Sequence, residues 1–195
     1  MNALANTLHQ HHLELSLTIK PKVPNLVKEL VFIDRFKTMQ YDNFDKGHNT
    51  VAPINPLPWI EHNIQILLAQ GVPAKKLQLG IANYGWEWRI DNGQSRMLFP
   101  FRPYNYFKDR TGGQKEWDND AQEWFSRYVY LGTAYKAYYS DHKTVMARVQ
   151  LARQYHLLGI TFWVLGREDP QIYPKIRELL QQPIKKRVDP VSATN

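Results

Sequence analysis

The chain has 195 residues, of which 43% are hydrophobic, and its formal net charge is +7 at pH 7. This length and composition predict one globular domain with a sizeable core and exclude a disordered chain. The absence of cysteine excludes disulfides and thiolate metal sites. Apart from the tail 185–195, the basic residues are scattered as on a solvated surface, so we expect no nucleic-acid partner.

The amino-terminal stretch MNALANTLHQHH has neither the basic start nor the apolar middle of a signal peptide. No run of the sequence approaches 18 apolar residues, so we expect no membrane span. Leu4 and Leu8 would lie on one face of a helix, which indicates that the chain begins with the end of a helix. These observations leave the localisation open.

Strands and helices alternate along the first part of the chain. Apolar and polar residues alternate in LELSLTI at 13–19, which predicts a strand, and a second strand is predicted over 34–41. Apolar residues at helical spacing predict a helix from about Leu57, and LQLGIAN at 77–83 is typical of a third strand. Because the elements alternate, we expect a parallel sheet.

The carboxyl-terminal part continues this alternation. An apolar stripe predicts a helix over 141–158. The run ITFWVL at 160–165 is β-branched, aromatic and uninterrupted, so we expect a strand buried on both faces. Asp169 and Pro170 are typical of an N-cap and a first helical turn, so a last helix is predicted from there through IYPKIRELLQQ, which ends at residue 182.

The segment 88–140 breaks the rhythm. It is rich in aromatic residues, with a hairpin signal at Asn92 and Gly93 and a turn signal at Gly112 and Gly113. We therefore predict a small antiparallel insertion. The expected units are residues 1–87, the insertion at 88–140, a closing helix-strand-helix unit at 141–184 and the basic tail at 185–195.

Polar and aromatic residues gather where the predicted strands end. Tyr41 and Asp42 follow the second strand, Trp86 and Trp88 follow the third, and Trp163 lies in the fourth. The carboxyl ends of parallel strands are where α/β folds build binding sites. Flat rings beside a few polar groups suit a sugar, so the sequence predicts a carbohydrate cleft.

Three separated motifs then carry a resemblance to a known family. They are MQYD at 39–42, PLPWIEHNIQILLAQGVPAKKLQLGIANYGWEW at 56–88, and YYSDHKTVMARVQLARQYHLLGITFWVLGREDPQIY at 138–173. In this order they resemble the carboxyl-terminal half of a glycoside hydrolase family 18 barrel. The chitinase-like and spore-germination N-acetylglucosaminidase members are the most similar in character.

The resemblance implies an α/β fold that is a partial (β/α)8 TIM barrel, strands five to eight, with a small α+β insertion between strand seven and helix seven. On this mapping the four strands are 13–19, 34–41, 77–83 and 160–165.

The resemblance also implies roles for individual residues. In family 18 the tyrosine of the Met-x-Tyr-Asp motif hydrogen-bonds the substrate's N-acetyl group, and this group attacks the anomeric carbon in place of a protein carboxylate. Tyr41 matches that tyrosine, and Asp42 matches the aspartate that contacts sugar hydroxyls and the catalytic acid. The positions matched to substrate binding are Met39, Tyr84, Trp86 and Trp163.

One family motif is absent from the sequence. Family 18 catalysis needs Asp-x-x-Asp-x-Asp-x-Glu on the fourth strand, whose glutamate is the general acid, and this spacing does not occur. The acidic residues Asp118, Asp120 and Glu123 have the wrong spacing, and we expect them to form the solvated start of a helix. Strands one to four are expected to be absent, so the chain alone should lack activity.

Cofactor and metal sites are not expected. His9, His11 and His12 have no carboxylate or cysteine at ligand spacing, so the sequence predicts no metal site there. No phosphate-binding loop of the Gly-x-x-x-x-Gly-Lys type occurs either.

Two functions stay open at this point. The chain could be the carboxyl-terminal half of a hydrolase of β-1,4-linked N-acetylglucosamine glycans, chitin or peptidoglycan, or a non-catalytic carbohydrate-binding remnant of that fold. An open barrel exposes two strand edges, which favours a partner besides the glycan. This partner could be the missing amino-terminal half-barrel or a second copy of the chain.

Overall fold

The computed structural model describes all residues except 1, 21–30, 44–49, 99–110, 167 and 185–195, so the predicted basic tail lies outside the described residues. The described elements, in chain order, are α1 (Asn2–Gln10), β1 (Ser16–Ile19), β2 (Arg35–Met39), α2 (Leu57–Ala69), the 3-10 helix η2 (Ala74–Lys76), β3 (Leu77–Ala82), β4 (Gly85–Arg89), β5 (Ser95–Leu98), β6 (Thr111–Asp118), β7 (Glu123–Tyr130), β8 (Thr133–Tyr139), α4 (His142–Gln154), β9 (Gly159–Trp163) and α5 (Ile172–Leu180).

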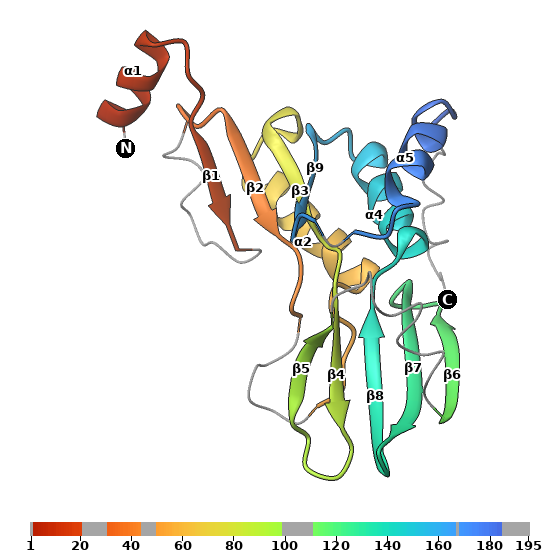
Figure 1. The fold of residues 1–195 in the computed structure, drawn as a ribbon. Helices are drawn as coiled ribbons and strands as arrows, with labels where there is room; N and C mark the ends of the chain where they lie inside the picture. The colour runs from red at the N-terminus through yellow and green to blue at the C-terminus, as the bar shows by residue number, and fades with distance from the viewer. Residues whose placement is uncertain (1, 21–30, 44–49, 99–110, 167, 185–195) are drawn as a thin grey trace, which may run out of the picture.

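A four-stranded parallel sheet forms one end of the molecule. Its strand order is β1-β2-β3-β9, and every neighbouring pair is parallel. The prediction of a parallel sheet is therefore confirmed, with each strand within a few residues of its expected bounds. Figure 1 shows the carboxyl ends of these strands pointing toward a second sheet, and α1 lies at the opposite end of the molecule.

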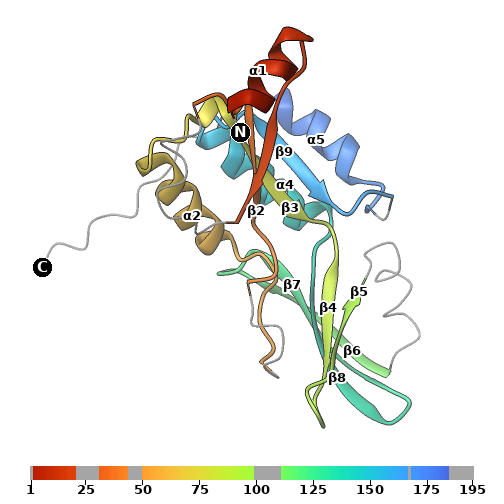
Figure 2. The ribbon, with the colours of Figure 1, turned by 90° about the vertical axis from the view of Figure 1, so that its left-hand side faces the viewer.

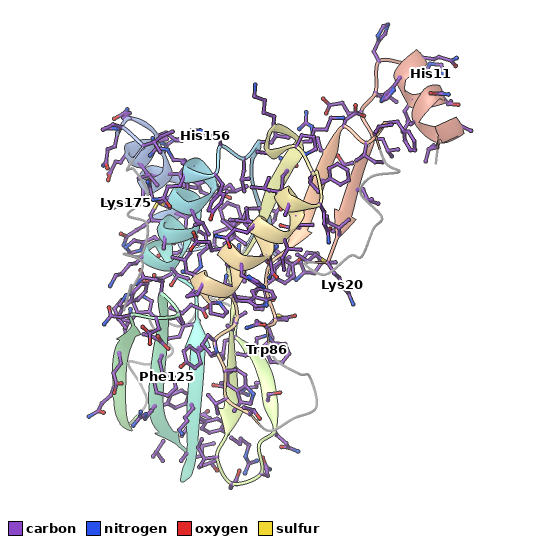
Figure 3. The ribbon with its side chains drawn as sticks, turned by 180° about the vertical axis from the view of Figure 1, so that it is seen from behind. His11, Lys20, Trp86, Phe125, His156 and Lys175 are labelled. Carbon is purple, nitrogen blue, oxygen red and sulfur yellow. The ribbon has the colours of Figure 1, made fainter. Side chains whose placement is uncertain are left out.

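Helices cover one face of the parallel sheet. Ile60 and Ile64 of α2 and Val145 and Val149 of α4 pack against β3 in one buried cluster. The α4 helix begins after Asp141, whose carboxylate accepts hydrogen bonds from two amides of the first turn. Seen from behind, α2 lies over the strands in Figure 3. None of the described helices is long and apolar enough to cross a membrane.

The segment between β3 and α4 forms an antiparallel sheet, as predicted. Its five strands run in the order β5-β4-β8-β7-β6, and in Figure 2 this sheet continues from the end of the parallel one. The β4–β5 hairpin turns at Gly93, which has a φ of +67°. The turn expected at Gly112 and Gly113 is wrong, because both residues lie within β6 at an irregularity of its pairing with β7.

The expectation that 160–165 is buried on both faces is also wrong. The strand ends at Trp163, four of its five residues are only partly buried, and Trp163 itself is 53% exposed. The reason is that β9 is the last strand of the described sheet, and the described helices pack on only one of its faces.

The face of the parallel sheet opposite the described helices, here called the uncovered face, is polar along most of its length. Phe36, Leu79 and Phe162 pack toward the helices, so the residues that alternate with them face the other way. This uncovered face carries Ser16, Thr18, Arg35, Lys37, Met39, Gln78, Gly80, Ala82, Gly159, Thr161 and Trp163. Larger apolar side chains occur on it only toward the carboxyl ends of the strands.

Gly80 of β3 pairs with Met39 and lies in close contact with the backbone of β2. A Cβ at this position would lie 1.9 Å from the carbonyl oxygen of Thr38 and 3.5 Å from Cε1 of Tyr41. Because the nearer obstacle is backbone, Gly80→Ala is expected to force the strands apart and lower the free energy of unfolding by about 1–3 kcal/mol. Urea denaturation measures this change.

Gly159→Ala is the matched control, because nothing lies within 4 Å of the Cβ it would add to β9. Equal stabilities of the two variants would contradict the close approach at Gly80.

A buried polar network lies where the antiparallel sheet meets the helices. Arg148 of α4 is fully buried, and its guanidinium donates hydrogen bonds to the backbone carbonyl oxygens of Ala121 (2.9 Å), Asn55 (2.6 Å), Thr144 (3.1 Å) and Gln122. These carbonyls belong to the β6–β7 turn, the loop before α2, and α4 itself. Arg148 therefore ties the antiparallel sheet to the helical layer.

The same turn corrects the prediction for the acidic cluster. Asp118, Asp120 and Glu123 do not start a helix, because they end β6, form the turn and begin β7. Glu123 is fully buried, and both its carboxylate oxygens accept from the amide of Asn55 at 3.2 Å. Burial raises the pKa of Glu123 to about 7, against the opposing influence of the nearby Arg148 charge.

Candidate functional site

The predicted site residues lie along the carboxyl ends of β2, β3 and β9. Tyr41 and Asp42 come directly after β2, while Tyr84 links β3 to β4, and Trp163 is the last residue of β9. Trp86 belongs to β4, and Figure 3 shows it at the end of this strand nearest the parallel sheet.

One carboxylate oxygen of Asp42 accepts two side-chain hydrogen bonds. The Tyr84 hydroxyl donates to Oδ1 of Asp42 at 2.6 Å, and the Trp86 indole Nε1 donates to the same oxygen at 3.2 Å. Asp42 has a φ of +56°, a left-handed conformation that aspartate tolerates better than most residues. The structure thus brings together three of the predicted site residues.

Tyr41 and Tyr84 meet edge to face. Their ring centroids are 6.2 Å apart with an interplanar angle of 74°. Burial, followed by the charge of Asp42, raises the pKa of Tyr41. Burial and the hydrogen bond to Asp42 raise the pKa of Tyr84 far above its ordinary value. Both hydroxyls are therefore protonated donors throughout the physiological range.

Trp163 differs from these residues because its ring is largely exposed. It pairs with Ala82 across the sheet, and the amide of Asn83 donates to its carbonyl oxygen at 3.0 Å. The Asn83 side chain donates to the carbonyl of Val164 at 2.7 Å, and the peptide bond between Trp163 and Val164 is cis. Asn83 thus holds the backbone on both sides of that bond.

Met39 lies at a strand end, whereas Trp88 does not. Met39 pairs with Gly80 on the uncovered face and is partly buried. Trp88, which we expected at the same end as Trp86, is only 1% exposed and lies farther along β4. Ile54 was not expected at the site, but it packs beside Tyr84, and its carbonyl accepts a hydrogen bond from the amide of Asn43 at 2.9 Å. No local motif marks such a contact.

One group of side chains has the composition of a metal site. Ligand atoms of Asp141, His142 and Asp169 lie within 4.8 Å of one another. However, Asp141 caps α4, and Asp169 accepts from both the amide of His142 (3.0 Å) and its ring Nδ1 (2.6 Å). These hydrogen bonds account for the positions of all three side chains without a bound ion. His9, from the amino-terminal histidines, contacts Asp34 through Nε2 at 2.9 Å.

The fold and the site define an α/β protein that presents aromatic rings around a fixed carboxylate at the ends of parallel strands. The model for glycosyl hydrolases family 18 matches residues 1–168. The chain belongs to this family.

Curated relatives include plant and bacterial proteins. A class V chitinase of Arabidopsis thaliana is 27% identical in an alignment of 164 positions that covers 70% of this chain and 41% of the chitinase. The cortical fragment-lytic enzyme of Bacillus subtilis is 23% identical in an alignment of 181 positions that covers 84% of this chain and 41% of the enzyme. The chain thus spans about two fifths of the length of these relatives.

Solved structures share the fold. The chitinase of Chromobacterium violaceum matches with a TM-score of 0.79 and 21% identity, over 93% of this chain and 60% of that one. The spore cortex-lytic enzyme SleL of Bacillus megaterium matches with a TM-score of 0.76 and 20% identity, over 95% and 45%. A Cycas revoluta family 18 chitinase solved with (GlcNAc)3 matches with a TM-score of 0.72 and 21% identity, over 90% and 60%.

Proposed function

We propose that the chain binds glycans of β-1,4-linked N-acetylglucosamine, chitin or peptidoglycan, at the carboxyl ends of its parallel strands. The observation that carries this proposal is the constellation of Asp42, Tyr41 and the exposed Trp163 ring on strand ends of one sheet. A sugar packs its C–H face on such a ring while its hydroxyls and amide need fixed polar partners. Met39, Tyr84 and Trp86 belong to the same site.

The chain would supply the carboxyl-terminal half of a substrate-assisted hydrolase. The parallel order β1-β2-β3-β9 suits strands five to eight of a (β/α)8 barrel. The partial coverage of the relatives and of the solved structures supports the same assignment. In this role Tyr41 donates to the N-acetyl group that attacks the anomeric carbon, and Asp42 contacts the sugar hydroxyls and the catalytic acid.

The chain by itself would not hydrolyse these glycans. Its sequence lacks the Asp-x-x-Asp-x-Asp-x-Glu motif that provides the general acid in this family. A general acid contributes roughly 10² to 10⁴ in rate, and the aspartate that orients the nucleophile is absent as well.

A complementary half-barrel suits the uncovered sheet face better than a second copy does. Arg35 and Lys37 lie on this face, and none of the described strand residues beside them is a carboxylate. Arg35 is paired with Glu14, which precedes β1. Two copies closing on each other would enclose both Lys37 ammonium groups with no carboxylate of the described strands to compensate them, which is costly. A partner half with inward carboxylates would avoid that cost.

The proposal is tested by titrating the chain with (GlcNAc)3 in a calorimeter and by assaying the same mixture for hydrolysis. We expect binding without turnover, and we expect Trp163→Ala to weaken binding by about tenfold or more, since it removes the ring on which the sugar packs. Tyr130→Ala, on an exposed ring of the antiparallel sheet, is the control and should bind normally. Turnover by the chain alone, or equal affinities of the two variants, would contradict the proposal.

A further inference from the structure

The indole of Trp86 is oriented by hydrogen bonding as well as by packing. Its Nε1 donates to Oδ1 of Asp42, the same oxygen that accepts from the Tyr84 hydroxyl. A carboxylate oxygen that accepts two directed hydrogen bonds is held in one orientation, much as an outer partner orients a ligand of a metal. Trp86 therefore has a means of acting on the site that does not require it to touch a sugar.

The two donors come from a part of the chain that is itself fixed. Tyr84 has no exposed surface, so it can act on a ligand only through its neighbours, and its hydroxyl is bonded to Asp42. Trp86 is partly buried and pairs with Tyr138 of β8. Between them, a Cβ at Gly85 would lie 2.5 Å from Cβ of Tyr139, so β4 and β8 are in close contact there. Because Tyr84 and Trp86 both donate to Asp42, the packing of β4 on β8 also helps to fix the position of the Asp42 carboxylate.

We propose that Trp86 and Tyr84 are positioning residues, which orient the Asp42 carboxylate toward a glycan hydroxyl or its catalytic partner. This inference rests on the proposed function, because it concerns the same site. It assigns Trp86 a role different from that of Trp163, whose exposed ring is a surface on which a sugar can pack.

The two roles for Trp86 predict different results for Trp86→Phe. Phenylalanine keeps an aromatic ring but removes the indole donor. If Trp86 were a packing surface, this variant would retain most of the affinity. If Trp86 positions Asp42, the variant should lose affinity to the extent that Tyr84→Phe does, since each removes one donor from the same oxygen.

The experiment combines calorimetry with (GlcNAc)3 and ¹H–¹⁵N spectra of the full chain. We expect Trp86→Phe and Tyr84→Phe each to weaken binding about three- to tenfold, corresponding to one hydrogen bond. In an Asp42→Ala background neither change should weaken binding further, because the group they orient is gone. Trp88→Phe, on the fully buried neighbour in β4, is the control for general effects of a smaller ring.

The spectra provide a result that does not depend on sugar. The Trp86 indole N–H resonance should shift upfield and exchange faster with solvent in Asp42→Ala, while the Trp88 indole resonance stays in place. Wild-type affinity in Trp86→Phe, or an unchanged Trp86 indole signal in Asp42→Ala, would overturn the inference. Absence of (GlcNAc)3 binding by the unaltered chain, with the indole shift observed, would overturn the proposed function and leave the contact to Asp42 established.

Discussion

Replacing Arg148 with methionine is expected to lower the free energy of unfolding by about 3–5 kcal/mol, in the range found when one partner of a buried charged network is removed. Methionine keeps the apolar stem but removes the guanidinium. The carbonyls of Ala121, Asn55 and Gln122 would then lose their donor in the interior, and each buried orphaned group costs about 1–3 kcal/mol. Chemical denaturation followed by tryptophan fluorescence measures the change.

Arg127→Met is the matched control for this variant. Arg127 is exposed on β7, where its guanidinium lies 5.1 Å from the ring centroid of Phe125, so its loss should change stability by no more than about 0.5 kcal/mol. Hydrogen exchange adds spatial detail, because amides of β6 and β7 should lose protection first in Arg148→Met. Similar stabilities of the two variants would show that the network contributes little.

The fold was predictable where its signals are local. The apolar residues of α2 recur at helical spacing, and Ile60, Ile64 and Leu67 are indeed buried. The alternation in β2 likewise gives an alternating burial pattern. Such patterns reflect which face of one element meets the core, so neighbouring residues are sufficient to reveal them.

The buried network was not predictable, because its partners are distant in sequence. Asn55 and Arg148 are separated by 93 residues, and Glu123 lies in a turn whose composition is typical of a solvated segment. Only the pairing of β6 with β7 and the packing of α4 bring these groups together. A sequence pattern cannot distinguish a buried glutamate from an exposed one when the contacts that bury it are long-range.

The candidate site was predictable only in part. Tyr41 and Asp42 could be placed at a strand end from local periodicity, and Trp86 could be expected nearby because parallel strands end at one edge. The hydrogen bonds from Trp86 and Tyr84 to one oxygen of Asp42 could not be predicted, since they depend on the direction in which the chain continues from β3 into β4. The exposure of Trp163 was mispredicted because a continuous apolar run does not reveal whether both faces of a strand are covered.

The stability of the chain should depend on pH through Glu123. Burial raises its pKa from 4.5 to about 7 in the folded chain, whereas the unfolded chain titrates near the ordinary value. Between these values the folded state holds a proton that the unfolded state has released, so stability falls as pH rises through this window. The free energy of unfolding falls by at most about 3 kcal/mol, a decrease that is complete above pH 7 and absent below pH 4.5.

Glu123→Gln is expected to abolish this dependence. The amide keeps an oxygen that can accept from the Asn55 N–H, but it does not ionise. The Arg148 guanidinium keeps its hydrogen bonds, because they go to the carbonyl oxygens of Gln122, Thr144, Asn55 and Ala121 and not to the carboxylate. The two proteins should have similar unfolding free energies near pH 4.5, and the glutamine variant should be the more stable above pH 7.

The measurement is the unfolding free energy of both proteins as a function of pH. Asp34 and Asp169 have lowered pKa values and act at more acidic pH, and their contribution cancels when one curve is subtracted from the other. A difference that is constant between pH 4.5 and 8 would show that Glu123 is ionised throughout the range, with its burial fully compensated by the Arg148 charge.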